Sequence, residues 1–305
     1  MEDFLRNILK YKPIIFLDNL IYRIGEDKIF AIGAQLSYFL ILSIFPFLIV
    51  FLNIISYTSL VRMDLIYGFI QYLPLDIQNI ISSFIKDLVI NSSQQLLSIA
   101  ALAGIWTAST GLTPVIRAIN NAYDYEEKRS YFKLKGISIL FTIALLILLS
   151  LVFVTLVLGE IIGKRLFEYM GKGEDFIGIW MNVRFIIPIV FMVYIFALLY
   201  KYSPCVEKGH SIKLSSSIPG GVFATFGWIL TSTAFSAYVN NFGEYSTTYG
   251  SLGGMIVLLI WLYLSSIIIV LGGEFNATIE FFKINNYKVI EEKSVIYKLI
   301  SKMSK

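Results

Sequence analysis

Polar side chains that could bind a solute or hold a charge interrupt long apolar runs of this sequence. Arg117 and Asn120 follow one apolar run, and Glu274 and Asn276 follow another. An acid and a base at the same depth of a low-dielectric environment should pair, because burying either charge alone is costly. We therefore predict a contact between Arg117 and Glu274. The alternative is that each side chain reaches separately to water or to lipid head groups.

Six further polar or small residues lie within the apolar runs and could extend such a site. With the four residues above they form a candidate substrate-binding set: Gln35, Ser37, Tyr38, Thr107, Ser109, Thr110, Arg117, Asn120, Glu274 and Asn276. The alternative interpretation is that the small residues only let helices pack closely. A second polar group, without any base, lies at 238–250 and could line an outer vestibule or belong to an interfacial aromatic belt. Its members are Tyr238, Asn241, Tyr245 and Tyr249.

The elements that must position these residues are six apolar stretches, at 30–57, 96–116, 137–160, 183–201, 218–239 and 251–273. A helix needs about 20 residues to cross about 30 Å of hydrocarbon. Composition agrees, since 57% of the residues are hydrophobic and only 15% are charged. The sequence predicts an all-α, polytopic membrane bundle in one domain, 1–305. That domain comprises an amphipathic cytoplasmic segment (1–29), six transmembrane helices (30–282) and a basic cytoplasmic tail (283–305).

Basic residues indicate how the helices are oriented. Nineteen of the 25 lysines and arginines fall on the side that holds both termini. Because positively charged loops stay in the cytoplasm, both termini are predicted to be cytoplasmic. Between the first two transmembrane helices, residues 64–91 show helical periodicity and predict an amphipathic hairpin on the extracytoplasmic side. This hairpin could close a cavity or lie in the membrane interface. At the outer boundary, Glu160 and Arg184 are a weaker candidate pair.

Several classes of chemistry lack the residues they would need. The single cysteine, Cys205, allows neither an internal disulfide nor a thiolate metal site. The single histidine, His210, has no HxxxH partner, so we predict no metal, no cofactor and no catalytic residues. The basic residues are spread over many loops, which argues against a nucleic-acid partner. No phosphate-binding loop is present, so ATP would not drive any transport.

Three segments carry a family resemblance: AIGAQLSYFLILSIFPFLI, GIWTASTGLTPVIRAINNAYD and the region from PGGVFATFGWILTS to LGGEFNA. They resemble the YihY/BrkB family of bacterial inner-membrane proteins, formerly labelled ribonuclease BN-like. The resemblance implies six spans, cytoplasmic termini and the bacterial plasma membrane. Thr110 departs from the family pattern, in which an arginine commonly follows the serine. The motif positions that the resemblance adds are Gln35, Ser37, Tyr38, Pro46, Ser109, Asn120, Tyr123, Pro219, Gly220, Tyr238, Tyr245, Tyr249, Gly250, Trp261, Gly272, Glu274 and Asn276.

Two functions fit this pattern. The first is a transporter or flippase-like protein, not driven by ATP, for a lipid, an amphipathic molecule or an anionic small molecule. The second is a noncatalytic membrane scaffold whose small-residue helices bind other helices. Ribonuclease activity is not expected, because RNA cleavage needs a metal-bound water or an acid and base pair. The expected partners are membrane lipids and the substrate, and the sequence leaves the oligomeric state open.

Overall fold

The computed structural model describes residue 9 and residues 11–57, 94–153, 185–206, 211–242, 252–284 and 290–303. Every regular element in these ranges is a helix, which confirms the all-α prediction. The α-helices are α2 (Lys12–Glu26), α3 (Ile29–Tyr57), α6 (Gln94–Ala122), α7 (Tyr131–Phe153), α10 (Ile186–Tyr202), α11 (Leu214–Phe242), α13 (Leu252–Ile284) and α14 (Val295–Met303), and η2 (Glu291–Lys293) is a 3-10 helix. The predicted hairpin at 64–91, Glu160, Arg184 and His210 lie outside the described residues.

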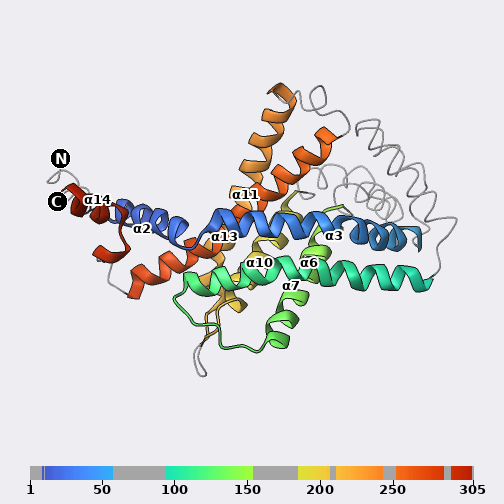
Figure 1. Cartoon of the computed structure of the whole chain (residues 1–305), viewed down its shortest axis with the longest axis horizontal. Coiled ribbons are helices and arrows are strands. Elements are labelled where there is room, and N and C mark those ends of the chain that lie inside the picture. The colour runs from blue at the N-terminus through green and yellow to red at the C-terminus, as the bar shows by residue number, and fades with distance from the viewer. Residues whose placement is uncertain are drawn as a thin grey trace, which may run out of the picture.

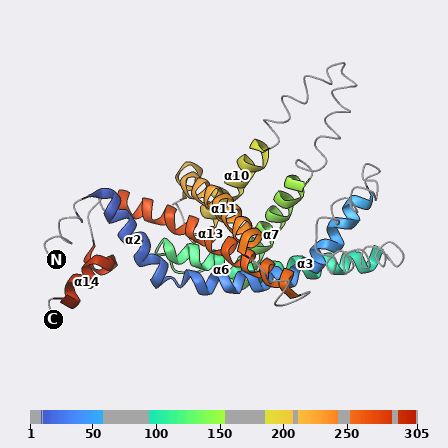
Figure 2. The ribbon, with the colours of Figure 1, turned by 90° about the horizontal axis from the view of Figure 1, so that it is seen from above.

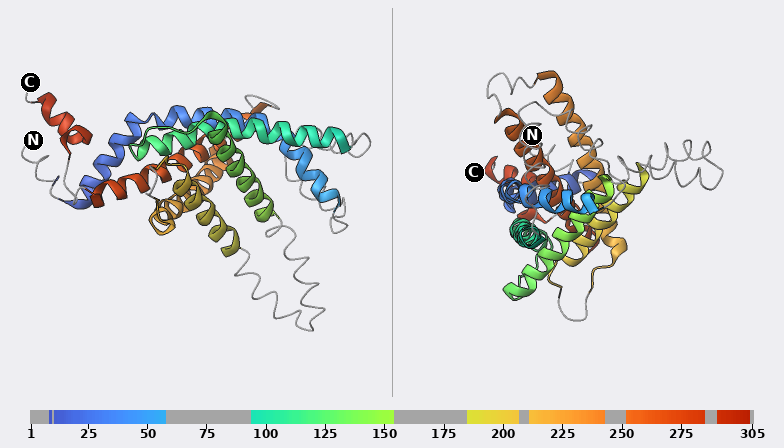
Figure 3. Two further views of the ribbon diagram at one scale, coloured as in Figure 1. Left: turned by 90° about the horizontal axis from the view of Figure 1, so that it is seen from below. Right: turned by 90° about the vertical axis from the view of Figure 1, so that its right-hand side faces the viewer.

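Two long helices, α3 and α6, lie side by side and run antiparallel across the molecule (Figure 1, Figure 2). Helix α13 packs against α3, α6 and α11, while α10 packs between α11 and α7. Helices α7 and α10 project to the same side of the α3–α6 pair (Figure 3). The short helix α14 contacts α2, so both ends of the described chain meet at one end of the bundle (Figure 1).

Within the described residues, each predicted apolar stretch overlaps one helix, namely α3, α6, α7, α10, α11 or α13. Three helices are long and apolar enough to cross a membrane, within Tyr131–Leu148, Leu214–Val239 and Gly253–Ile284. The described apolar parts of two others are shorter, Ile29–Ser43 and Ile186–Tyr202. The structure therefore agrees with a helical membrane protein that has several spans.

The largest boundary difference is at α13, which continues to Ile284 although its apolar stretch ends at residue 273. The added turns bring Phe275 and Phe282 onto Phe16 of α2, with ring centroids 5.2 and 6.0 Å apart. Phe275 also stacks on Phe223 of α11 at 4.5 Å. Hydrophobic runs mark only the part of a helix that lipid surrounds, whereas these turns form an amphipathic helix packed on protein.

The core lies where α3, α6, α10 and α13 meet, and includes Leu36, Ile116, Ile119, Phe196 and Val270. Small residues allow this approach, as the prediction of close packing required. A Cβ added to Gly220 of α11 would lie 2.3 Å from the carbonyl oxygen of Gly272 on α13. One added to Gly111 of α6 would lie 2.7 Å from the Cβ of Phe39 on α3.

The close packing does not extend along the whole of α11. Its first half is buried at Ser217 and Thr225, but Thr233 and Ser236 in its second half are exposed. The small-residue face of this helix is therefore buried along only part of its length. Beyond Gly220, α11 and α13 draw apart (Figure 1) and are bridged by long side chains, since Trp228 Nε1 donates to Ser265 Oγ at 3.0 Å and Trp261 Nε1 to Ser232 Oγ at 3.1 Å.

Candidate functional site

A buried guanidinium organises the end of the bundle at which α2 lies. Arg23 of α2 is only 4% exposed. Its Nε donates to Asn19 Oδ1 at 3.0 Å, and its Nη1 donates to the carbonyl oxygen of Ala122, the last residue of α6. Its Nη2 lies 3.7 Å from Asp124 Oδ2. A buried charge is tolerated only when paired and hydrogen-bonded, and these contacts meet that condition while tying α2 to α6.

The C-terminal segment joins the same network. Lys293 Nζ lies 2.8 Å from Asp124 Oδ2, and the carbonyl oxygen of Lys293 accepts a hydrogen bond from Asn19 Nδ2 at 3.0 Å. Asp18 Oδ1 accepts the backbone N–H of Ile296, in the first turn of α14, at 3.0 Å. A carboxylate that caps exposed N–H groups stabilises a helix start, here from a distant part of the chain. Three segments far apart in sequence thus meet around Arg23 and Asp124.

Glu274 of α13 lies beside this network and is fully buried. Neither of its carboxyl oxygens has a hydrogen-bond donor as partner. The groups that act on it electrostatically are Asp27, Arg23 and Asp124, and the carboxyl of Asp27 lies within hydrogen-bonding range. Ionised carboxylates only accept hydrogen bonds, so this contact between two carboxyl groups requires a proton on one of them.

Two titratable groups at the rim are perturbed. Asp27 lies between α2 and α3, next to Lys28, which adopts a left-handed backbone with φ of 52°. Burial raises the pKa of Asp27, although Arg23 and the hydrogen bond with Glu274 act in the opposite direction. Burial also raises the pKa of the Tyr123 hydroxyl, just after α6, and nearby Glu280 adds to the effect. The Tyr123 hydroxyl is buried without a hydrogen-bond partner.

The predicted pair of Arg117 and Glu274 is not formed, and that prediction was wrong. Arg117 is exposed, and no described ion pair joins it to Glu274. The face of α6 toward α13 carries Ile119, which a Cβ on Gly273 would meet at 2.7 Å. Arg117 precedes Ile119 by two residues, about 200° around a helix, and so points away. The charge of Arg117 acts instead on the carboxyl group of Glu127. Burial would raise the pKa of Glu127, but hydrogen bonds from Arg129 outweigh it and hold that pKa below its usual value.

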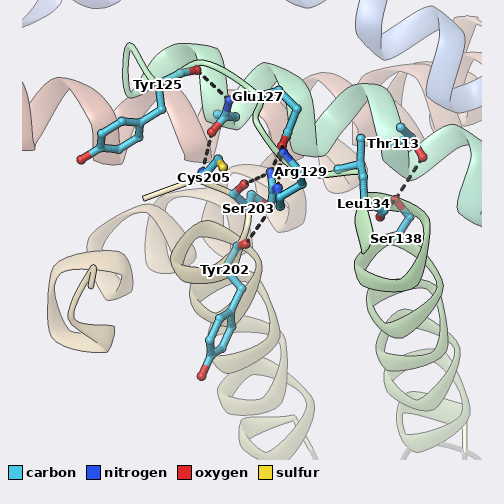
Figure 4. Close-up of polar contacts among 10 residues, drawn as sticks. Thr113, Tyr125, Glu127, Arg129, Leu134, Ser138, Tyr202, Ser203 and Cys205 are labelled. Atoms are coloured by element: carbon cyan, nitrogen blue, oxygen red, sulfur yellow. Dashed lines mark hydrogen bonds and ion pairs between the residues drawn. The ribbon is translucent and has the colours of Figure 1, made fainter. Parts of the chain in front are cut away.

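Asn120 is fully buried and serves as a clamp between segments. Its Nδ2 donates to the carbonyl oxygen of Tyr125 at 2.7 Å, and its Oδ1 accepts the backbone N–H of Cys205 at 2.5 Å. Nearby, Arg129 donates to the carbonyl oxygens of Tyr202 and Ser203 at the end of α10 (Figure 4). These contacts hold the α6–α7 connection against the chain that leaves α10.

Asn276 is a second clamp, between α13 and α11. Its Oδ1 accepts the backbone N–H of Gly220 at 2.7 Å, and its Nδ2 donates to the carbonyl oxygen of Ser217 at 2.8 Å. Pro219 lies between these two residues, inside α11, where it lacks the donor that a helix normally uses. The side chain of Asn276 therefore satisfies backbone groups at the point where α11 is perturbed.

Four other candidate residues use their hydroxyls within or between helices. Ser37 and Ser109 are buried and donate to Ala34 and Trp106 of their own helices at 2.8 and 2.7 Å. Thr107 donates to Ala103 at 2.8 Å. Thr110 donates to the carbonyl oxygen of Trp106 at 3.0 Å and accepts a hydrogen bond from Lys135.

The remaining candidate residues do not join the buried network. Gln35 and Tyr38 lie on an exposed face of α3. Of the outer group, Tyr238 is exposed on α11 and Asn241 belongs to the last turn of that helix. Tyr245 and Tyr249 lie outside the described residues. The ten candidates therefore do not form one cluster, and Glu274 alone of the ten lies beside Arg23 and Asp27.

Sequence reasoning missed the importance of Lys135, which it counted only as a loop charge. This lysine, in the second turn of α7, is 6% exposed. Its Nζ donates to Thr110 Oγ1 at 2.8 Å and to the carbonyl oxygen of Trp106 at 3.1 Å, and lies 4.4 Å from the centroid of the Trp106 ring. It thus places a positive charge beside Thr110, where the family pattern carries an arginine. An adjacent contact joins Thr113 and Ser138 at 3.0 Å (Figure 4).

Arg23 and Asp27 were also missed as site residues, although a signal existed. Asp18, Asn19 and Arg23 lie on the buried face of the amphipathic α2, where apolar residues would be expected. Polar residues on the apolar face of a helix indicate a specific partner. No group of three or more His, Cys, Asp or Glu side chains that could hold a metal occurs among the described residues.

Comparison with known proteins gives consistent similarities. The family model described as Virulence factor BrkB matches residues 20–294. YfkH of Bacillus subtilis (strain 168), named as a ribonuclease-like protein, is 38% identical over 253 residues, which cover 83% of this chain and 89% of YfkH. A UPF0761 membrane protein of Pseudoalteromonas atlantica is 26% identical over 289 residues, covering 92% of this chain and 91% of that protein. One of Tolumonas auensis is 26% identical over 271 residues, covering 86% and 84%. No solved structure matches the chain.

Proposed function

Since the chain belongs to the BrkB family of membrane proteins, we propose that it is a transporter or flippase-like protein not driven by ATP. Its substrate would be a lipid or another amphipathic or anionic small molecule, taken from the inner leaflet. The six described helices from α3 to α13 would all cross the bacterial plasma membrane, and both termini would lie in the cytoplasm. The positive charge on the connections at that side supports this orientation and suits an anionic head group.

The observation that carries the proposal is the buried carboxyl of Glu274, which no donor reaches. Burying a polar group without a donor costs about 1–3 kcal/mol or more, so a purely structural role would favour an apolar residue there. Ionisable residues within membrane helices are rare and usually mark ion or substrate pathways. In this chain the carboxyl lies near the end of α13 beside Arg23, at the level of the proposed cytoplasmic boundary.

The test uses purified protein in vesicles of phosphatidylethanolamine and phosphatidylglycerol that contain a fluorescent analogue of either lipid. Movement of the analogue between leaflets is measured by dithionite quenching, with and without a pH gradient. Wild-type protein is expected to accelerate movement over protein-free vesicles, and Glu274→Gln is expected to reduce it about tenfold or more. Glu280→Gln, the same change two turns further along α13, is the matched control. Wild-type vesicles that match protein-free vesicles for both lipids would count against transport.

A second candidate function is a noncatalytic scaffold. It is favoured by Asn120 and Asn276, because the amide groups of both are occupied by contacts within the chain and are not offered to a substrate. A scaffold would co-purify with specific membrane proteins after crosslinking in cells and would move no lipid. A transporter would move lipid when purified alone.

The ribonuclease-like name of YfkH is not extended to this chain. RNA hydrolysis needs a metal-bound water or a positioned acid and base, and the sequence holds one histidine. We propose that the protein is not a nuclease. Degradation of RNA by purified protein, lost on His210→Ala, would contradict this proposal.

A further inference from the structure

The part of the chain that the structure describes has two buried acidic residues, Asp18 and Glu274. Asp18 accepts a backbone N–H, at Ile296. Glu274 has no donor, and the carboxyl of Asp27 lies within hydrogen-bonding range. The two acids therefore differ in kind, because Asp18 has the contacts of a structural carboxylate and Glu274 does not.

The cation that acts on Glu274, Arg23, is already paired with another acid. Arg23 on α2 and Lys293 in the C-terminal segment are the cations, and Asp124 after α6 lies 3.7 and 2.8 Å from them. Asp27, between α2 and α3, is the second anion, and the buried Tyr123 hydroxyl, just after α6, is a nearby neutral group that Glu274 influences electrostatically. Asp27 and Asp124 both act on Glu274, and Glu26 and Glu280 add negative charge around Asp27 and Tyr123. A negative charge on Glu274 would therefore be buried beside other anions, without a hydrogen-bonded counterion of its own, which is strongly unfavourable.

From this arrangement we infer that Glu274 and Asp27 together bind one exchangeable proton. Two facing carboxyl groups cannot both ionise at low cost, so they share a proton until its release becomes favourable. When bound, the proton forms an O–H bond on one carboxyl and is donated to an oxygen of the other. When released, it passes to water, and two carboxylates then face each other beside Arg23.

Asp27 provides the connection to water. Its side chain is only partly buried, and it interacts with Asp124, whose side chain is 57% exposed. Glu274 is fully buried, whereas Asp27 is only partly buried, and burial disfavours the charged form of a carboxyl group. The proton would therefore reside mainly on Glu274 and exchange through Asp27.

The inference rests on the proposed function for its biological meaning, because the proton would then be the ion coupled to lipid movement. Release of the proton would set two negative charges against each other at the joint between α2, α3 and α13. Repulsion between the two carboxylates would favour separation of α13 from the end of α2. The bundle would then have two conformations whose populations depend on the proton, as coupling of proton release to lipid movement requires.

The test measures protonation directly, by infrared difference spectroscopy of full-length protein in phosphatidylethanolamine and phosphatidylglycerol nanodiscs during a pH titration. Wild type is expected to show a protonated-carboxyl band that disappears as pH rises. Glu274→Gln should abolish the band, and Glu280→Gln should retain it. Glutamine preserves the shape of the protonated acid and can still donate to Asp27, so this variant is expected to fold. A band unchanged by Glu274→Gln would overturn the inference.

A second variant tests whether the proton is shared. Asp27→Asn removes the facing negative charge, so the midpoint of the Glu274 band should move to lower pH by about one unit or more. An unchanged midpoint would contradict sharing. This result can be separated from the result of the transport assay. If the wild type moves no lipid but the band is lost in Glu274→Gln, the proton site stands and the proposed function is wrong. If the wild type moves lipid but its band does not change in Glu274→Gln, the transport function stands and the proton site is wrong.

Discussion

The side-chain oxygen of Asn276 accepts the backbone N–H of Gly220 at 2.7 Å, which joins α13 to α11 at the closest crossing of the two helices. Because the amide nitrogen of Asn276 also donates to Ser217, one side chain satisfies two backbone groups near Pro219. The joint that results holds the first half of α11 against the part of α13 that carries Glu274.

Replacing Asn276 with alanine should therefore destabilise the protein. The change leaves a buried N–H and a buried C=O without partners, and the expected loss is about 1–3 kcal/mol. Thermal unfolding in detergent micelles measures it as a lower Tm. Asn121→Ala is the control, because Asn121 is exposed and its change should leave the Tm close to that of wild type. Equal Tm values for the two variants would show that the Asn276 clamp contributes nothing.

Adding one methyl group at Gly220 should have a similar effect by a different mechanism. The new Cβ of Gly220→Ala would lie 2.3 Å from the Gly272 carbonyl oxygen, so the two backbones must separate. We expect a loss of about 1–3 kcal/mol from this overpacking. Gly136→Ala on α7 is the matched control, because nothing lies within 4 Å of the added Cβ. Alanine there should stabilise the helix by about 0.5–1 kcal/mol, and Tm shifts of the same sign would refute the prediction.

The raised pKa of Asp27 predicts how stability depends on pH. The folded protein keeps the proton on Asp27 to a higher pH than the unfolded chain, whose Asp value is near 3.8. The stabilisation of the folded protein by Asp27 is therefore fully present below the pKa of the unfolded chain. It is lost as the pH rises through the higher pKa that Asp27 has in the folded protein. Plots of Tm against pH should fall less steeply for Asp27→Asn than for wild type across this window. Glu291→Gln, at an exposed acid of η2 that is not among the groups acting on Asp27, should keep the wild-type slope.

The contact between Lys135 and Thr110 predicts a measurable coupling between α7 and α6. Lys135→Met removes the hydrogen bonds to Thr110 and Trp106 together with the cation–π contact. In a double-mutant cycle with Thr110→Val, the coupling free energy of unfolding should be about 0.5–2 kcal/mol. The corresponding cycle with Lys133→Met, an exposed lysine of the same helix, should give a value near zero. Equal couplings in the two cycles would argue against the contact.

Local sequence patterns were sufficient to predict the helices. Apolar runs located each described helix from α3 to α13, and the amphipathic segment predicted at 1–29 contains α2 (Lys12–Glu26). Helix ends were less predictable. Helix α7 begins at Tyr131, six residues before its apolar stretch, since polar first turns continue a helix without adding to its hydropathy.

The partner of Glu274 shows where sequence reasoning stops. Depth along the chain placed Arg117 and Glu274 at the same level, and that inference ignored which way each side chain points around its helix. In the structure Ile119 faces α13, so Arg117 is turned outward. Arg23 of α2 acts on Glu274 electrostatically instead, without a hydrogen bond to it.

By itself, the sequence determined the helical membrane character of this protein and the small residues at its helix crossings, because periodicity and apolar length are local properties. Only the tertiary structure decided that Asn120 and Asn276 are clamps, that Lys135 reaches Thr110, and that Asp27 and Arg23 meet Glu274. Apart from the bond between Asn120 and Tyr125, these interactions join residues between 25 and 251 positions apart, and they depend on how each helix is rotated about its axis. Packing of the whole bundle sets that rotation, which no single segment specifies.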